Sequence, residues 1–378
     1  MSLVCFLVVK LYLCGTRFGK ERGGWQGICR EPSLRGSVET FMKKIGLMGC
    51  GMIAEFGHLP AILATEGLEA WAVYDPDPER AYSLQHKFGI PHGYAVSDMF
   101  FESGIEAVVV CSSAPAHRAN VAGAAHYGLP VLCEKPLAMT DDDAEWMIHT
   151  MSDAGLLLAT GFCYRFSPVA QNIKKLVDSG TIGEVRALRL VYIWNLHGRD
   201  RVTDAGLAEP NPYWQGRMAE GGPMVDCGVH QIDLSRWWLN SEVIGYQASG
   251  AWVENYEAPD HVWLHMDHES GAHTMAEMSF SYGHTARDPR SHFSYHLIGT
   301  EGLIRYDRDG WLFEVRTKHG THRLPGASEK NFEGLYAAFA NALETGDASD
   351  LPTGHDGLRA TQIARDATQS VIARRRRK

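Results

Sequence analysis

The stretch that decides the fold is residues 45–54, which read Ile-Gly-Leu-Met-Gly-Cys-Gly-Met-Ile-Ala. A short apolar run leads into a G-x-G-x-x-A turn, and an amphipathic stretch comes after it. Gly49 permits the tight turn, and Gly51 lets a pyrophosphate approach the backbone. The N–H groups of Met52 and Ile53, at the start of the next helix, then point at that anion. The segment predicts the first strand and helix of a dinucleotide-binding domain.

An aspartate at the end of the next strand supports this interpretation. Residues 69–74 read as a strand, and Asp75 comes directly after it. A carboxylate at this position accepts hydrogen bonds from the adenosine ribose hydroxyls and repels a 2′-phosphate, so NAD is expected rather than NADP. Asp75 also begins the sequence Asp-Pro-Asp-Pro, and a purely structural place in that turn is the alternative.

Short apolar runs and amphipathic stretches alternate through this part of the chain. Near-continuous apolar strands separated by helices indicate a doubly wound parallel sheet covered on both faces. We expect this α/β Rossmann domain to span residues 42–161, after an unpatterned extension at residues 1–41. Thr140 precedes three aspartates and is expected to cap a helix. The expected strands are 45–48, 69–74, 106–111, 130–133 and 156–160, and the helices are 52–64, 77–88, 116–127 and one after residue 140.

Two polar segments fall at the carboxyl edge of the predicted sheet, where ligands bind in open α/β folds. After the strand at 106–111, Ser112, Ser113 and Pro115 are expected to line the dinucleotide. His117 either contacts a ribose or caps the next helix.

The second polar segment, residues 133–136, reads Cys-Glu-Lys-Pro. A lysine at the end of a later strand faces the group that the cofactor presents. Lys135 is therefore predicted to handle the proton that accompanies hydride transfer.

Three motifs together resemble the Gfo/Idh/MocA oxidoreductase family. They are the glycine turn at 49–54, the Pro-Ala-His at 115–117 and the Glu-Lys-Pro-Leu at 134–137. The resemblance extends from residue 43 to about residue 375. It implies an NAD-dependent oxidoreductase whose last segment packs back on the core.

The resemblance also implies roles for individual residues. Glu134 would contact the nicotinamide ribose, Lys135 would lie near the reacting carbon, and the bond to Pro136 would often be cis. Tyr164 and Arg165, in the crossover from the cofactor domain, would approach the active site, with Arg165 at the cofactor. An inter-domain ion pair is the alternative for Arg165.

The second half of the chain predicts a mostly antiparallel sheet. We expect residues 162–378 to form an α+β domain for substrate binding and oligomerisation. Strands are expected at 184–195, 243–254, 260–269, 272–282, 291–298 and 302–306, with helices at 331–344 and 357–374.

A second motif lies at residues 220–233, Glu-Gly-Gly-Pro-Met-Val-Asp-Cys-Gly-Val-His-Gln-Ile-Asp. On a helix, Asp226, His230 and Asp233 are spaced i, i+4, i+7 and share one face. A satisfied buried His–Asp network is the structural alternative. The motif resembles the family's Gly-Gly-x-x-x-Asp-x-x-x-His-x-x-Asp pattern, which implies that the first aspartate and the histidine meet substrate hydroxyls.

Oxidation of a secondary alcohol requires groups of these kinds. His230, with an ordinary pKa of about 6.5, can take a proton near neutrality. Asp226 can orient His230 or hold a neighbouring hydroxyl. The pKa of Lys135, ordinarily about 10.4, is expected to be lowered by burial and by the cationic nicotinamide. Lys135 would then stabilise an alkoxide or act as the base, and the sequence leaves the choice between Lys135 and His230 open.

Aromatic and histidine side chains suggest two further surfaces. Trp214 matches a common family tryptophan and is expected to stack on a sugar ring. Alternation places His261, Trp263, His265 and Asp267 on one face of a strand. Such a face commonly packs on another subunit in the family, so a homodimer or homotetramer is expected. Metal binding there is the weaker alternative, and no metal is expected.

Bulk properties limit the classes of partner. With 378 residues, two domains are the default. The formal net charge of -9 argues against a nucleic-acid or anionic-membrane surface. Eight cysteines without a CxxC pair favour a reduced, cytoplasmic protein. The basic run at 374–378 is expected to be a solvated tail.

These observations favour an NAD-dependent dehydrogenase or reductase that acts on a sugar, cyclitol or related polyol. Two alternatives belong to the same resemblance. One is a redox-neutral glycosidase that retains NAD, and the other is a non-catalytic, nucleotide-sensing regulator.

Overall fold

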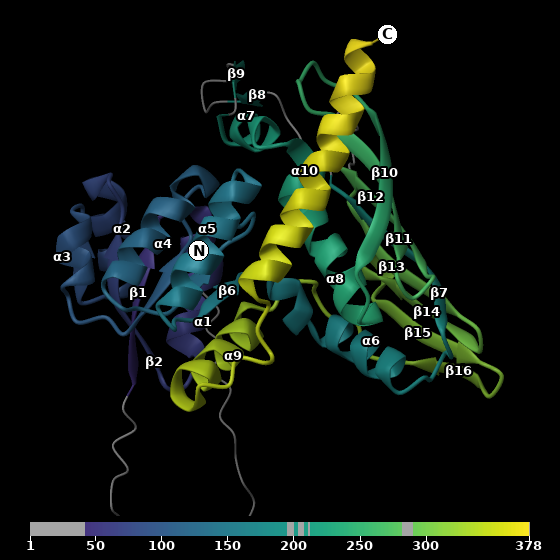
Figure 1. Cartoon of the computed structure of the whole chain (residues 1–378), viewed down its shortest axis with the longest axis horizontal. Coiled ribbons are helices and arrows are strands. Elements are labelled where there is room, and N and C mark those ends of the chain that lie inside the picture. Colours follow the sequence, from purple (N-terminus) through teal and green to yellow (C-terminus); the bar gives the residue numbers. More distant parts are fainter. Residues whose placement is uncertain (1–41, 195–199, 203–207, 211, 282–289, 378) are drawn as a thin grey trace, which may run out of the picture. The chain divides into compact units, whose positions relative to one another are not determined.

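The first sheet of the computed structural model is parallel throughout. The structure describes residues 42–194, 200–202, 208–210, 212–281 and 290–377. Six strands lie in the order β3-β2-β1-β4-β5-β6 (Figure 1). They are β1 (Lys43–Met48), β2 (Leu68–Tyr74), β3 (His92–Tyr94), β4 (Ala107–Val110), β5 (Val131–Cys133) and β6 (Leu158–Thr160). The order reverses between β1 and β4, so a ligand crevice is expected at the carboxyl ends of these two strands. The doubly wound fold predicted from the sequence is confirmed.

Helices connect these strands and cover the sheet. They are η1 (Ala54–His58), a π-helical turn that continues as α1 (Leu59–Ala64), then α2 (Pro78–Phe88), α3 (Ser97–Phe101), the 3-10 turn η2 (Ala114–Ala116), α4 (His117–His126) and α5 (Asp141–Asp153). Thr140 caps α5 as predicted, because its side chain accepts a hydrogen bond from the N–H of Asp143. The short elements β3 and α3 were not predicted.

The second sheet is mostly antiparallel, also as predicted. Its order is β10-β11-β12-β7-β13-β14-β15-β16, and the β12–β7 pair is parallel. The strands are β7 (Val185–Ile193), β10 (Val243–Ala251), β11 (His261–His268), β12 (His273–Ser279), β13 (His292–Gly299), β14 (Gly302–Asp307), β15 (Leu312–Thr317) and β16 (Gly320–Arg323). The last two strands were not predicted. A small separate pair consists of β8 (Asp200–Val202) and β9 (Ala208–Pro210).

One face of the second sheet is buried and the other is half-exposed. Along β11 the burial alternates, with Val262, Leu264 and Met266 buried. The alternate positions His261, Trp263, His265 and Asp267 share the other face, as predicted. Trp238, Tyr295 and Tyr306 are among the largest side chains of the buried core.

The remaining helices include those that carry Tyr164, Arg165, Trp214, Asp226 and His230. They are the 3-10 turn η3 (Cys163–Phe166), α6 (Pro168–Asp178), α7 (Pro212–Ala219), the π-helical turn η4 (Met224–Gly228), which continues as α8 (Val229–Leu239), the 3-10 turn η5 (Arg308–Gly310), α9 (Phe332–Thr345) and α10 (Gly354–Arg376). The long helix α10 contacts both sheets, through β6 and β10. Before it, the backbone carbonyl of Pro352 accepts a hydrogen bond from the N–H of Thr160. The last segment of the chain therefore packs back on the first sheet.

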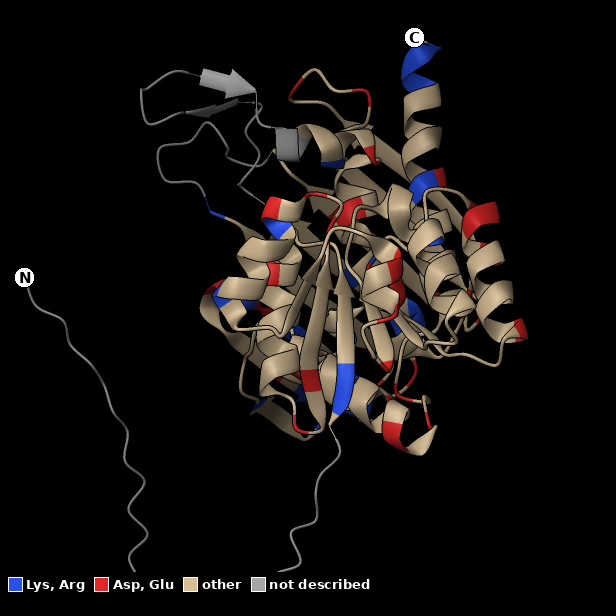
Figure 2. Cartoon of the chain, turned by 90° about the vertical axis from the view of Figure 1, so that its left-hand side faces the viewer, with Lys and Arg blue, Asp and Glu red and all other residues tan. Residues whose placement is uncertain are grey.

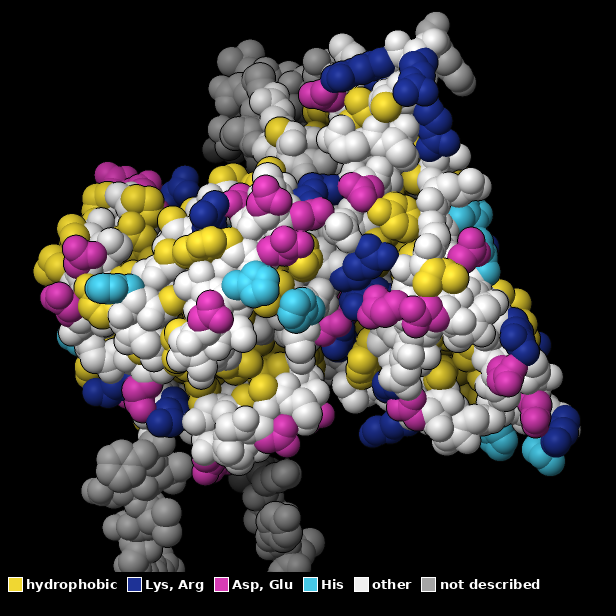
Figure 3. Space-filling model, in the orientation of Figure 1, with side chains coloured by type: hydrophobic (Ala, Val, Ile, Leu, Met, Phe, Trp, Pro, Cys, Tyr) yellow, Lys and Arg dark blue, Asp and Glu magenta, His cyan; other side chains and the backbone are white. Residues whose placement is uncertain are grey.

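The basic C-terminal run is helical, and Arg374 to Arg377 are exposed, as expected of a solvated segment. Arg374, Arg375 and Arg376 form the last turn of α10. Arg374 donates a hydrogen bond to the carbonyl of Ala248, and Arg376 pairs with Glu257. Elsewhere acidic and basic residues are interspersed along the ribbon in Figure 2 and over the face drawn in Figure 3. No helix in the described ranges is long and apolar enough to cross a bilayer.

Candidate active site

The glycine turn has the geometry that a dinucleotide requires. Gly49 has φ +99°, and a Cβ there would come within 2.4 Å of the backbone nitrogen of Ser112. At Gly51 a Cβ would meet no atom within 4 Å, so the backbone is open on that side. The turn and the end of β4 therefore pack tightly, and the space beside Gly51 is open. Next to the turn, Met52 is exposed and Ile53 is half-buried.

Asp75 is buried and braces this turn. Its Oδ2 accepts the N–H of Cys50 at 2.8 Å, and its Oδ1 accepts the N–H of Asp77 at 3.0 Å. Asp75 therefore has the structural role in the turn that was predicted as the alternative. Each carboxylate oxygen has a second lone pair, so each can accept one further hydrogen bond.

The segment after β4 divides into exposed and buried residues. Ser113 and Pro115 are exposed beside the turn. Ser112 accepts a side-chain hydrogen bond from Asn120 at 2.8 Å. His117 is buried, and its ring nitrogens lie 3.1 Å from the carbonyl oxygen of Leu137 and 3.0 Å from that of Ser112. Burial lowers the pKa of His117, so its neutral ring has one N–H and donates to one of these two carbonyls. No side chain caps α4, so the helix-cap alternative is not realised, and a ribose contact stays a prediction.

Lys135 joins the first sheet to the second motif. The peptide bond between Lys135 and Pro136 is cis. From there the ammonium group donates to Oδ1 of Asp226 at 2.9 Å and to the Asp226 carbonyl at 2.8 Å. The two motifs, 91 residues apart, therefore meet in one site. The side chain of Lys135 keeps 16% of its surface exposed.

Electrostatics keep this pair ionised. Burial alone would raise the pKa of Asp226, but the charges of Lys135 and Arg217 lower it well below its usual range. Burial alone would lower the pKa of Lys135, but Asp226 outweighs burial and raises it. The expectation of a lowered lysine pKa is therefore wrong in this arrangement, because a buried carboxylate lies in direct contact.

Arg217, from α7, was not predicted as a site residue, because nothing in its local sequence pattern marks it. Its guanidinium pairs with the same Oδ1 of Asp226. One buried carboxylate is thus shared by two cations.

His230 lies one helical turn beyond Asp226 but makes different contacts. Its ring stacks on that of Tyr164, with centroids 3.9 Å apart and an interplanar angle of 2°. Burial and the charge of Lys135 lower the pKa of His230 well below its ordinary value. The ring is 5% exposed, and its Nδ1 has no hydrogen-bond partner among the described residues. No described hydrogen bond joins His230 to Asp226, so the expectation that Asp226 orients His230 is corrected.

Asp233 belongs to a separate ion-pair network. Its carboxylate takes two hydrogen bonds from Arg165, at 2.8 and 2.5 Å, and Arg165 also lies 3.2 Å from Asp356. Burial would lower the pKa of Arg165, but the two carboxylates raise it. The guanidinium is therefore held by α8 and α10. The ion-pair alternative predicted for Arg165 is the one its geometry supports.

The shared face predicted for Asp226, His230 and Asp233 is thus only partly realised. Asp226 lies in the π-helical turn η4, which has more residues per turn than an α-helix and shifts the register of the residues after it. Trp214 lies in α7, but its side chain is outside the described residues.

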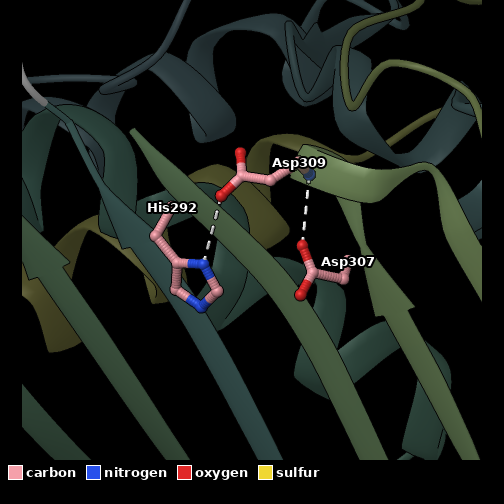
Figure 4. Close-up of side chains that lie close together, drawn as sticks. All are labelled: His292, Asp307 and Asp309. Carbon is pink, nitrogen blue, oxygen red and sulfur yellow. Dashed lines mark hydrogen bonds and ion pairs between the residues drawn. The ribbon is translucent and has the colours of Figure 1, made fainter. Parts of the chain in front are cut away.

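A different polar group, on the second sheet, has residue types that can bind a metal. The ligand atoms of His292, Asp307 and Asp309 all lie within 4.8 Å of one another (Figure 4). Each already has protein partners. Nδ1 of His292 is 3.4 Å from Asp309, Oδ1 of Asp307 accepts the N–H of Asp309 at 3.1 Å, and Arg305 lies 3.7 Å from Asp307. The group is a hydrogen-bonded corner of the sheet, and we assign it no metal.

Comparison with known proteins agrees with this geometry. Residues 43–162 match the family described as an oxidoreductase family with an NAD-binding Rossmann fold, and residues 170–305 match the GFO/IDH/MocA C-terminal domain. The chain is 27% identical over 344 residues to inositol 2-dehydrogenase of Acidothermus cellulolyticus, covering 87% of this chain and 92% of that one. It is 26% identical over 280 residues to D-apiose dehydrogenase of Rhizobium rhizogenes, covering 73% and 76%.

A solved structure shares the fold. An oxidoreductase from Agrobacterium radiobacter, crystallised with NAD+, L-tartaric acid and magnesium, superposes with a TM-score of 0.73 at 24% identity, covering 88% of this chain and 96% of that one.

The protein is therefore an oxidoreductase built on an NAD-binding Rossmann fold. It belongs to the Gfo/Idh/MocA family.

Proposed function

We propose that the protein is an NAD-dependent dehydrogenase that moves a hydride between nicotinamide and a secondary alcohol of a sugar, cyclitol or related polyol. The observation that carries the proposal is the contact of Lys135 with Asp226, 2.9 Å apart, beside the neutral His230. The curated relatives named above act on inositol and D-apiose, according to their names. Those names support the substrate class.

The cofactor residues follow from the crevice at β1 and β4. Gly49 and Gly51 would admit the pyrophosphate against the backbone of Met52 and Ile53. Asp75 would accept the adenosine ribose hydroxyls, which favours NAD over NADP. The cofactor supplies the site that accepts or delivers hydride. Ser112, Ser113, Pro115 and Glu134 would line the rest of it.

Lys135 and His230 would then share the proton chemistry. The Lys135 ammonium is held by Asp226 and can stabilise an alkoxide that forms on the substrate. His230 is neutral, because burial and the charge of Lys135 lower its pKa, so the imidazole can accept a hydroxyl proton. Tyr164 stacks on the imidazole and limits its rotation. Trp214 would supply an apolar wall for the sugar ring.

Three further proposals concern the protein as a whole. The domain division falls at about residue 161, with residues 1–41 as an extension. The half-exposed face of β11, with Trp263 at its centre, would pack on another copy in a homodimer or homotetramer. The five described cysteines are free, which favours a reducing compartment, the cytoplasm.

The proposal is tested with the purified full chain and a panel of cyclitols, aldoses and glycosides. NAD reduction is followed by absorbance, with NADP in parallel. We expect one polyol class to reduce NAD, and Lys135→Ala and His230→Ala each to lose most of that turnover while still binding NAD. Near-native turnover in both variants would overturn the site assignment. Release of an aglycone without net NAD reduction would identify a redox-neutral glycosidase instead.

A further inference from the structure

A buried chain of three polar side chains lies behind Glu134. The hydroxyl of Tyr336 is 2.7 Å from Nδ1 of His58, and Nε2 of His58 is 3.1 Å from Oε1 of Glu134. His58 and Tyr336 have no exposed surface, and Glu134 is 6% exposed. The three residues come from η1, α9 and the end of β5, elements distant in the sequence. The fold therefore brings together buried polar groups that no local motif specifies.

The local packing is built around His58. It is the last residue of the π-helical turn that comes after the glycine turn. Phe332 and Tyr336, one turn apart on α9, meet its ring edge-on at centroid distances of 5.0 and 5.9 Å. A Cβ on Gly57 would come within 2.9 Å of the Phe332 ring, so glycine there allows α9 to approach. This places α9 against the first helix after the cofactor turn (Figure 1).

The hydrogen bonds have one consistent direction. Glu134 as a carboxylate can only accept, so Nε2 of His58 must carry a proton. When the imidazole is neutral, Nδ1 then accepts a hydrogen bond from the hydroxyl of Tyr336. The other carboxylate oxygen, Oε2, accepts the backbone N–H of Lys135 at 3.0 Å. Both oxygens of Glu134 are thus held.

Glycine at position 161 closes the remaining side of the carboxylate. A Cβ at Gly161 would lie 3.0 Å from Oε1 of Glu134. The crossover from the first sheet therefore passes directly over Glu134, which leaves the carboxylate little freedom to turn.

The contacts also fix the charge of Glu134. Burial alone would raise its pKa, but the hydrogen bond and charge of His58, followed by the charge of Lys135, lower it to about 2. Among the favourable contacts, that of His58 is the largest. Loss of His58 would leave a buried carboxylate without its main partner.

We propose that His58 and Tyr336 are positioning residues that hold the Glu134 carboxylate in one orientation toward the cofactor, so that helix α9 is part of the NAD site. The inference rests on the proposed contact of Glu134 with the nicotinamide ribose. Neither His58 nor Tyr336 needs to touch the cofactor, because both act through Glu134.

The first test titrates the full chain with NADH and follows nicotinamide fluorescence. Tyr336→Phe removes one hydroxyl and keeps the ring, and we expect it to weaken NADH binding about three- to tenfold, the effect of one buried hydrogen bond. The matched control is Tyr306→Phe, which removes a hydroxyl that donates to the carbonyl of Ala327 at 2.6 Å. The control should lose comparable thermal stability and leave NADH binding unchanged.

The second test uses pH, which a merely structural role would not affect. A buried carboxyl group without a partner has a raised pKa. In His58→Ala, NADH binding should therefore weaken as the pH falls below about 6, whereas the native protein should bind evenly down to about pH 5. His58→Gln keeps an N–H that can reach Glu134 and should restore most of the native profile.

The variant Glu134→Gln distinguishes a failure of the positioning role of His58 and Tyr336 from a failure of the proposed cofactor role of Glu134. If Glu134→Gln weakens NADH binding but Tyr336→Phe matches Tyr306→Phe, the positioning role alone is overturned. A flat pH profile in His58→Ala would have the same meaning. If Glu134→Gln binds NADH as tightly as the native chain, the cofactor role of Glu134 is wrong, and this inference falls with it.

Discussion

Two regions of the active site are built alike and used differently. Each has a π-helical turn, η1 after the cofactor turn and η4 in the second motif, and a histidine at or just beyond it. Such turns are rare and often occur at functional sites. In the first region, both nitrogens of His58 are engaged and the ring is fully buried. In the second, Nδ1 of His230 has no partner among the described residues, and the ring lies near an ionised lysine.

The difference distinguishes a histidine that holds a neighbouring residue in place from one that can react with a substrate. A histidine with both nitrogens in hydrogen bonds can fix a neighbour, but it has no lone pair left for a substrate. A buried histidine with an unsatisfied nitrogen is costly to maintain unless something else uses that atom. The same contrast holds for the acids, because Glu134 is held by a histidine and a backbone N–H, whereas Asp226 is shared by Lys135 and Arg217.

The largest expected effect is at Lys135. Lys135→Met keeps the length of the side chain and removes the cation, so turnover should fall about 10³- to 10⁴-fold through lost alkoxide stabilisation and proton transfer. NADH binding should change little, because the ammonium pairs with Asp226 and not with the glycine turn. Single-turnover kinetics and NADH titration on the same preparation measure the two quantities. Lost NADH binding with unchanged turnover at saturation would reverse the roles of the two regions.

The next effect is on stability, at the buried ion pair of Arg165 and Asp233. Arg165→Met leaves Asp233, whose side chain is 1% exposed, without its cation. Removing one partner of a buried pair costs about 3–5 kcal/mol of the free energy of unfolding. Urea denaturation measures this cost. The double variant Arg165→Met/Asp233→Leu should recover part of the loss, because Asp356, 3.2 Å from the guanidinium, still loses a partner. No recovery at all would show that the loss does not come from the unpaired Asp233.

A smaller effect is expected at His230. His230→Gln should lower kcat about 10²-fold, the usual range for loss of a general base. Because the pKa of His230 lies well below its ordinary value, the ring stays neutral as the pH falls. The native kcat should therefore stay level from pH 8 to about pH 6 and decline only below that. A midpoint near pH 7 in the native rate profile would show that His230 is not the group that titrates.

The sequence predicted the fold more completely than the site, and the reason is physical. Strand β4 and the glycine turn have local patterns, a run of buried valines and a G-x-G-x-x-A spacing, that specify structure almost unaided. The acceptors around His117 and the partner of Arg165 depend on segments that only the folded chain brings together. His58 and Tyr336, 278 residues apart, left no local signal.

Register explains the remaining error. The i, i+4, i+7 spacing of Asp226, His230 and Asp233 assumed a regular α-helix. Asp226 lies in the π-helical turn η4 and pairs with Lys135, whereas Asp233 pairs with Arg165. The residue types at 224–228 do not predict a π-helical turn. The residue types of the site could be predicted, but their pairing required the structure.

The smallest expected effect concerns cofactor choice at Asp75. Asp75→Asn keeps the shape and one acceptor for the N–H of Cys50, and it removes the charge that repels a 2′-phosphate. The ratio of kcat/KM for NADP to that for NAD should rise about tenfold. Asp77→Asn is the matched control, because Asp77 caps α2 and its carboxylate accepts the N–H of Glu79 at 3.0 Å. Equal ratios in the two variants would mean that Asp75 only braces the turn, and the first region would then select its cofactor by shape and not by charge.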